Sequence, residues 1–126
     1  MITCLIVDDS KTIRKIITDI VKDFGFECSE AANGQIAFEA CQAAMPTIIM
    51  LDWNMPVMDG LEFLKKLRAM PNGTSPKVVF CTTENDMSFI QRGMEAGADE
   101  YIMKPFDRTI LRAKYVQLGL LEDEAG

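Results

Sequence analysis

The 126-residue chain contains no histidine, which is the most common general base and a frequent zinc ligand in proteins. Its four cysteines show no CxxC spacing, and Cys4 and Cys81 stand in apolar runs where a free cysteine acts as a small hydrophobe. These absences argue against a zinc site and against phosphohistidine chemistry. Any phosphoryl chemistry in this chain is therefore expected to use carboxylates.

Long hydrophobic runs and an excess of positive charge are missing as well. The apolar runs reach only about five residues, whereas a membrane-spanning helix needs ~20. The N-terminal stretch MITCLIVDDS has no basic residue before its apolar run, so it does not have the form of a signal peptide. The net charge of −6 and a pI near 4.6 disfavour nucleic acid as a partner. We expect a cytoplasmic protein that binds neither membranes nor nucleic acid.

Short apolar runs alternate with amphipathic stretches five times along the chain. Apolar runs such as residues 3–7 are typical of strands in a parallel sheet, and the i, i+3, i+4 spacing within 13–24 predicts a helix. This order predicts an α/β fold of the (βα)5 type, a doubly wound, three-layer α/β/α, flavodoxin-like domain with five parallel strands in the order 2-1-3-4-5. We expect the domain to cover residues 1–121 and an acidic tail to cover 122–126. The predicted strands are 3–7, 27–31, 47–51, 77–82 and 101–103, and the predicted helices are 11–24, 34–44, 60–70, 87–96 and 107–121.

Polar side chains stand where four of the predicted strands end. Asp8 and Asp9 follow the first strand, Asp52 comes directly after the third, Thr82 ends the fourth, and Lys104 follows the fifth. Because the carboxyl ends of parallel strands lie at the same edge of a sheet, these side chains are expected to meet there.

The three carboxylates raise one another's pKa unless a cation lies between them. A set of oxygen ligands without histidine or cysteine favours a hard divalent ion, above all Mg²⁺. Lys104 adds a positive charge and Thr82 a hydroxyl donor. This combination suits phosphoryl transfer to an aspartate, because the metal and the donors neutralise charge on the transferring oxygens.

Four motifs stand in register at the strand ends: VDDS at 7–10, DWNMPVMDG at 52–60, TTE at 82–84 and AGADEYIMKP at 96–105. With these motifs and the five-fold alternation, nearly the whole chain resembles the receiver domain of two-component response regulators. Within that family it is most similar to the stand-alone chemotaxis response regulators, whose pattern Trp53, Asn54, Glu84 and Tyr101 match.

The resemblance implies that Asp52 is the phosphoacceptor. It implies that Mg²⁺ is bound directly by Asp9 and Asp52, through water by Asp8, and by the backbone carbonyl of Asn54. Lys104 would pair first with the Asp52 carboxylate and then with a phosphoryl oxygen, while Thr82 would bond another phosphoryl oxygen. A cis peptide bond is expected before Pro105.

A conformational switch is also implied by the resemblance. Thr82 moves toward the phosphoryl group, and Tyr101 fills the space that it leaves. Asn54 and Glu84 are implied to tune dephosphorylation. The altered surface, formed by residues 87–96, 101–103 and 107–121, is where a downstream protein docks. The implied phosphodonor is a histidine kinase or a histidine phosphotransfer protein, and the chain is expected to be a monomer that catalyses only its own phosphorylation and dephosphorylation.

One residue departs from the family pattern. Many receivers carry alanine or glycine directly after the switch threonine, whereas this chain has Thr83. A branched side chain there is expected to crowd the entry to Asp52 and to slow small phosphodonors or phosphatases.

Simpler interpretations apply to several nearby residues. Trp53 is interpreted as a lid over the acidic pocket. A second group is expected to act as helix caps or turn residues: Ser10, Asn33, Asp59 and Asp107. Four methionines are interpreted as core packing: Met50, Met87, Met94 and Met103.

Two other protein classes share part of this pattern. A phosphatase or dehalogenase of the haloacid-dehalogenase type typically has a second acid two residues after its nucleophile, where this chain has Asn54. A flavin carrier shares the topology but needs a Ser/Thr/Gly-rich loop after the first strand, where this chain has Asp8 and Asp9. Among receivers, the sequence leaves open a motor-binding chemotaxis regulator, a phosphate sink, and a phosphorelay or stress-response shuttle.

Overall fold

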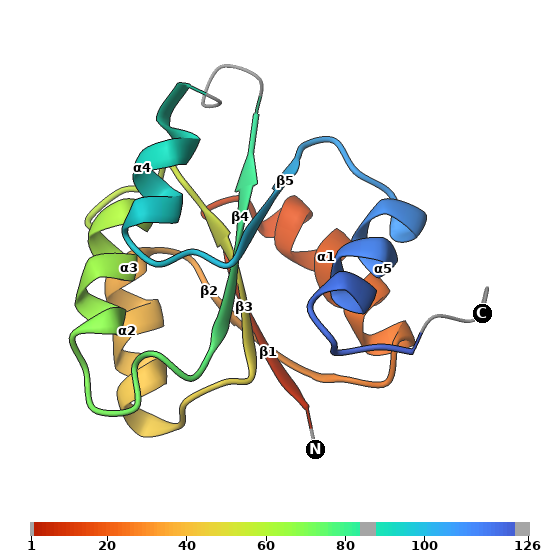
Figure 1. Cartoon of the computed structure of the whole chain (residues 1–126), viewed down its shortest axis with the longest axis horizontal. Helices are drawn as coiled ribbons and strands as arrows, with labels where there is room; N and C mark the ends of the chain where they lie inside the picture. The colour runs from red at the N-terminus through yellow and green to blue at the C-terminus, as the bar shows by residue number, and fades with distance from the viewer. Residues whose placement is uncertain (1, 84–87, 123–126) are drawn as a thin grey trace.

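A single parallel sheet with strand order β2-β1-β3-β4-β5 forms the centre of the computed structural model, which describes residues 2–83 and 88–122 (Figure 1). Strands and helices alternate along the chain, so the predicted fold class and strand order are confirmed. The strands are β1 (Thr3–Val7), β2 (Glu27–Ala31), β3 (Ile48–Asp52), β4 (Lys77–Thr82) and β5 (Glu100–Met103). The helices are α1 (Lys11–Asp23), α2 (Gly34–Ala43), α3 (Gly60–Arg68), α4 (Ile90–Glu95) and α5 (Arg108–Gln117).

Helices cover both faces of the sheet, with α1 and α5 on one side and α2, α3 and α4 on the other (Figure 1). Each side has its own hydrophobic core. Ile6, Ile17 and Tyr115 pack together on the α1–α5 side. Leu51 and Phe63 lie in the core on the α2–α3–α4 side. Because β1, β3 and β4 are buried on both faces, their carboxyl ends form a rigid platform for the residues that follow them.

Side-chain caps begin four of the helices, as the sequence predicts. Asp59 accepts a hydrogen bond from the N–H of Glu62 at 2.9 Å, so it caps α3. Satisfying an unpaired N–H in this way stabilises a helix by about 1 kcal/mol. The remaining caps, each bonded to the N–H three residues on, are Ser10, Asn33 and Asp107.

Two of the four methionines that were predicted to pack in the core are exposed instead. Met94 and Met103 are 38% and 41% exposed, because α4 is short and β5 lies at the sheet edge, so few neighbours cover them. Met50 is buried as predicted, and Met87 lies outside the described residues.

Helix α5 ends at Gln117, whereas the sequence predicts that it continues to residue 121. None of the described helices is long and apolar enough to cross a membrane.

Candidate functional site

Three aspartates meet at the carboxyl edge of the sheet, where their positions after β1 and β3 predict them. One carboxylate oxygen from each of Asp8, Asp9 and Asp52 lies within 4.8 Å of the others. Asp8 is buried, Asp52 is half-buried and Asp9 is exposed. The cluster is therefore open to solvent on one side and offers only oxygen donors, which is the ligand chemistry that a hard divalent cation prefers.

Lys104 contributes the positive charge of the site. Its Nζ donates to Oδ2 of Asp8 at 2.9 Å and to Oδ1 of Asp52 at 3.1 Å. Its backbone N–H donates to the carbonyl of Thr82 at 2.6 Å, and the peptide bond between Lys104 and Pro105 is cis. The backbone of Lys104 thus joins the end of β5 to the end of β4. Its side-chain ammonium group extends to the aspartates that follow β1 and end β3.

Burial dominates the electrostatics of Asp52. It raises the pKa of the Asp52 carboxyl from 3.8 to about 6, against the opposing effect of Lys104 and with a further increase from the charge of Asp8. Burial lowers the pKa of Lys104, but its hydrogen bonds and the charges of Asp52 and Asp8 outweigh that effect and raise the pKa overall. At neutral pH the site therefore holds one ammonium group and an ionised Asp52.

Backbone donors hold the carboxylates of Asp8 and Asp52 in place, and one side chain binds the backbone beside them. The N–H of Ser10 donates to Oδ1 of Asp8 at 2.9 Å, and the N–H of Trp53 donates to Oδ1 of Asp52 at 2.9 Å. Nη1 of Arg14 donates to the backbone carbonyl of Asp8 at 2.7 Å. Sequence reasoning missed Arg14, because nothing in the helical pattern of α1 shows that its side chain turns back toward the strand end.

Gly60 brings α3 into direct contact with the end of β3. Its N–H donates to the carbonyl of Trp53 at 2.9 Å, and a Cβ at this position would lie 2.2 Å from the carbonyl oxygen of Asp52. Only glycine fits this approach. In the sequence, Gly60 is predicted only to begin a helix; its position eight residues after Asp52, at the start of that helix, is the signal that could have identified this contact.

Trp53 is a core residue and not a lid, so that prediction is wrong. It is 7% exposed, and its ring centroid lies 4.8 Å from that of Phe80. A Cβ on Gly93 of α4 would lie 3.0 Å from the indole ring. Because α4 packs this closely, Trp53 faces the core under α4 and does not lie over the acidic cluster.

The other predicted site residues lie around this centre. Thr82 is fully buried at the end of β4, whereas Thr83 and Asn54 are exposed. Tyr101 is half-buried on β5, and Nζ of Lys114 lies 5.5 Å from its ring centroid. The remaining predicted residue, Glu84, lies outside the described part of the chain.

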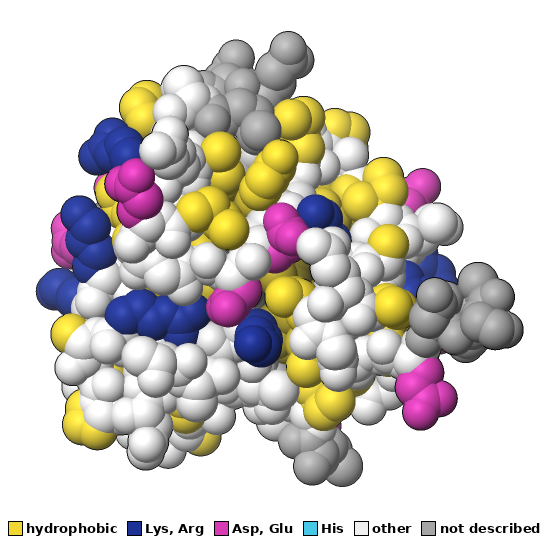
Figure 2. All heavy atoms as spheres, in the orientation of Figure 1, with side chains coloured by type: hydrophobic (Ala, Val, Ile, Leu, Met, Phe, Trp, Pro, Cys, Tyr) yellow, Lys and Arg dark blue, Asp and Glu magenta, His cyan; other side chains and the backbone are white. Residues whose placement is uncertain are grey.

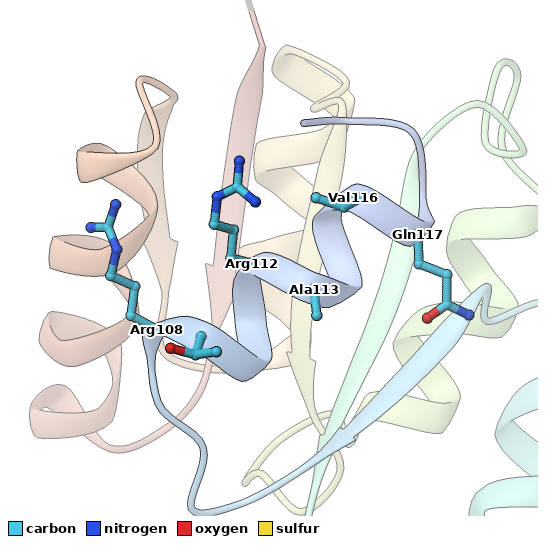
Figure 3. A pocket seen from close by; sticks show the side chains of 6 residues that line it. Arg108, Arg112, Ala113, Val116 and Gln117 are labelled. Carbon is cyan, nitrogen blue, oxygen red and sulfur yellow. The ribbon is translucent and has the colours of Figure 1, made fainter. Parts of the chain in front are cut away.

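Two grooves differ in their distance from the cluster. An apolar groove of about 330 Å³ adjoins Lys104 and is lined by Ile13, Ile16, Ile17, Thr83, Pro105 and Phe106. A second groove, of about 470 Å³, runs along α5, where Arg108 and Arg112 point the same way from successive turns (Figure 3). Only the first groove shares a residue with the acidic site.

Known proteins resemble the chain over most of its length. Residues 4–116 match the response regulator receiver domain family. The chain is 38% identical to chemotaxis protein CheY1 of Helicobacter pylori over 112 residues, covering 87% of this chain and 90% of that protein. It is 39% identical to CheY of Listeria monocytogenes over 107 residues, covering 84% and 88%. The structure of chemotaxis response regulator CheY4 of Vibrio cholerae superposes with a TM-score of 0.87 at 34% identity, covering 94% of this chain and 98% of that one.

Proposed function

This chain belongs to the response regulator receiver family, and we propose that it accepts a phosphoryl group on Asp52 from a histidine kinase or a histidine phosphotransfer protein. The observation that carries this proposal is the meeting of three carboxylates with one ammonium group at the carboxyl edge of the sheet. The family consists of signalling regulators and not of conventional enzymes, so the chemistry we assign is limited to the chain's own phosphorylation and its later hydrolysis.

Asp52 is the nucleophile of the proposed reaction. Trp53 and Lys104 both donate to Oδ1, and we assign the attack to Oδ2. A bond forms between this oxygen and phosphorus while the bond from phosphorus to the donor's leaving group breaks, and the electron pair leaves with that group. A pKa of about 6 keeps the carboxylate ionised, and therefore nucleophilic, at neutral pH.

Lys104 and Thr82 stabilise the transferred group in this proposal. The ammonium group already contacts Asp52 at 3.1 Å, so a short movement takes it to a phosphoryl oxygen. The Thr82 hydroxyl, at the end of the neighbouring strand, donates to a second phosphoryl oxygen. Preorganised donors of this kind stabilise charge that develops during transfer.

We assign Mg²⁺ to the acidic cluster. Asp9 and Asp52 would hold it directly, Asp8 through water and Asn54 through its backbone carbonyl. The three carboxylates supply the oxygen donors that this ion requires. When bound, Mg²⁺ neutralises the charge of the transferring oxygens.

The output surface in this proposal is the face formed by α4, β5 and α5. Figure 2 shows hydrophobic side chains gathered between α4 and the loop that follows β5. The exposed apolar side chains of this face are Phe89, Met94, Met103 and Ile110. An apolar patch of this kind fits a protein partner.

Tyr101 links the acidic site to this surface. When Thr82 moves toward the phosphoryl group, Tyr101 turns inward and the outline of the face changes. A difference of a few kcal/mol between the two arrangements suffices for a new charged group to reset their populations. The chemotaxis proteins among the relatives support a chemotaxis pathway for the resulting protein contact.

Mass spectrometry after incubation with acetyl phosphate and Mg²⁺ tests the phosphoacceptor. The wild-type chain should gain one phosphoryl group and Asp52→Asn none. Asp59→Asn is the matched control, because asparagine preserves the cap of α3 and labelling should continue. Labelling of the Asp52→Asn protein, or full labelling in the presence of a chelator, would contradict the assignment. Sustained release of phosphate from unrelated phosphate esters would favour the phosphatase class instead.

A further inference from the structure

Arg14 ties the acidic cluster to the edge strand β2. Its Nη1 donates to the backbone carbonyl of Asp8 at 2.7 Å, and its Nε donates to Oε1 of Glu30 at 2.9 Å. The Arg14 side chain is only 15% exposed. A guanidinium group is planar and rigid, so two such bonds fix its orientation and that of the carbonyl that it binds.

The carbonyl in question belongs to the peptide bond between Asp8 and Asp9. The N–H of Asp8 donates to the carbonyl of Ala31 at 3.1 Å, so β2 holds the other side of the same residue. The peptide unit is planar, and fixing its carbonyl also fixes the direction in which the chain continues into Asp9. Arg14 and β2 therefore fix the backbone from which the exposed Asp9 side chain extends.

From these contacts we propose that Arg14 is a positioning residue for the metal site, which acts by holding the peptide between Asp8 and Asp9 so that the Asp9 carboxylate faces Asp52. The inference rests on the proposed function, since it concerns Mg²⁺ at the acidic cluster. Arg14 acts on the cation only through this peptide. Outer groups that orient ligands in this way commonly change metal affinity by about 10-fold or more.

The charge of Arg14 and its positioning of the backbone are expected to change the affinity for Mg²⁺ in opposite directions, so a binding measurement can separate them. A positive guanidinium beside the cluster repels a divalent cation, so a pure charge effect predicts tighter binding when Arg14 is replaced by a neutral residue. A positioning role predicts weaker binding from the same substitution, because Asp9 loses its fixed direction.

Isothermal titration calorimetry with Mg²⁺ separates the two explanations. Arg14→Met should raise the dissociation constant about 10-fold, and Arg14→Lys, which keeps the charge but lacks the two-armed fork, should also bind Mg²⁺ more weakly than wild type. Trp53, the only tryptophan, follows Asp52 directly and provides a fluorescence signal for the same titration. Lys15→Met is the control, because it removes a positive charge from the same helix at an exposed position, where the Lys15 ammonium group bonds Asp19 at 3.2 Å.

Each result has a defined meaning. Unchanged or tighter binding by Arg14→Met would overturn the inference. An equal loss in Lys15→Met would also overturn it, because the effect would then not depend on the contact between Arg14 and the Asp8 carbonyl. If Arg14→Met does not fold, the comparison of Arg14→Lys with wild type still decides, and equal affinity contradicts positioning by the fork. If the wild-type chain itself shows no Mg²⁺ binding, the proposed metal site fails, and this inference falls with it.

Discussion

The strands of the sheet begin at one side, here called the amino edge, and end at the other, the carboxyl edge. Charged side chains are paired with opposite charges at the amino edge, whereas negative charge is in excess at the carboxyl edge. At the amino edge, Arg68 donates to the carbonyls of Gly97, Gly73 and Pro76 at 2.7–3.1 Å and to Oδ2 of Asp99 at 3.1 Å. The same Asp99 oxygen accepts from the N–H of Val78 at 2.8 Å. One cation thus joins the loop after α3 to the loop after α4, and both charges are paired.

At the carboxyl edge, three carboxylates lie together, and the ammonium group of Lys104 bonds two of them, Asp8 and Asp52. The raised pKa of Asp52 shows that this arrangement disfavours its ionised form. The chain therefore keeps one edge electrostatically satisfied for stability and leaves the other short of positive charge. A cation or a phosphoryl group that enters the second edge changes its energy, which is what a switch requires.

Removal of the Arg68 side chain should have the largest effect on stability. Arg68→Met would leave Asp99 without its cation and three buried or half-buried loop carbonyls without their donor, so we expect a loss of about 3–5 kcal/mol in the free energy of unfolding. Urea denaturation measures this loss. A decrease below about 1 kcal/mol, as for an ordinary surface ion pair, would show that the amino edge does not depend on Arg68.

Gly60→Ala tests the close contact beneath the acidic edge. The added Cβ would lie 2.2 Å from the carbonyl oxygen of Asp52, so α3 or the end of β3 must move. We expect a loss of about 2–3 kcal/mol, typical of overpacking, together with slower labelling of Asp52 by acetyl phosphate. Gly34→Ala is the matched control. Gly34 begins α2, and a Cβ there would lie 2.6 Å from the Met58 carbonyl oxygen, so this substitution also causes a close contact, but not with Asp52. Equal labelling rates in the two variants would contradict this role of Gly60.

Asp52→Asn should make the metal-free protein more stable at neutral pH. The pKa of Asp52 is raised from 3.8 to about 6 on folding, so between these values the folded state binds more protons than the unfolded state. The contribution of Asp52 to the free energy of unfolding therefore falls as pH rises from about 4 to about 6 and then levels off, by at most about 3 kcal/mol. Lys104 retains Asp8 as a partner in the variant.

Denaturation of both proteins in chelator across this pH range measures the effect. The variant should lack the decrease, so its advantage over wild type should grow from pH 4 to pH 7. A constant difference across the range would show that Asp52 is not destabilised by its surroundings.

The residues of the acidic edge could be predicted from the sequence, because each is identified by the few residues that precede it. An apolar run marks each buried strand, and the residue that follows the run is carried to the strand end, as for Asp8 and Asp52. Lys104 follows the same rule at β5. Parallel pairing then brings these ends together without any further detail of packing.

The contacts that hold the two edges were not predictable in this way. Arg68 bonds a carbonyl 29 residues away, and Arg14 bonds a carboxylate 16 residues away on another strand. Such contacts depend on how helices pack against loops, which leaves no periodic trace in the sequence. Trp53 was misassigned for the same reason, since its burial depends on the close approach of Gly93.

The loops at the two edges also differ in which residue adopts a left-handed backbone conformation. Among residues 2–83 and 88–122, each edge has one residue other than glycine with positive φ: Asn72 at 62° in the loop after α3, and Val57 at 71° in the loop after β3. Asparagine tolerates this conformation, whereas a β-branched residue is strained in it by about 1 kcal/mol or more. Because the Val57 side chain is 80% exposed, its removal loses little packing. Val57→Asn should therefore stabilise the chain by about 1 kcal/mol and Asn72→Val destabilise it by a similar amount, as measured by urea denaturation. A loss of stability in Val57→Asn would mean that the valine contributes contacts that outweigh its strain, and the loop at the carboxyl edge would then be as well satisfied as the one at the amino edge.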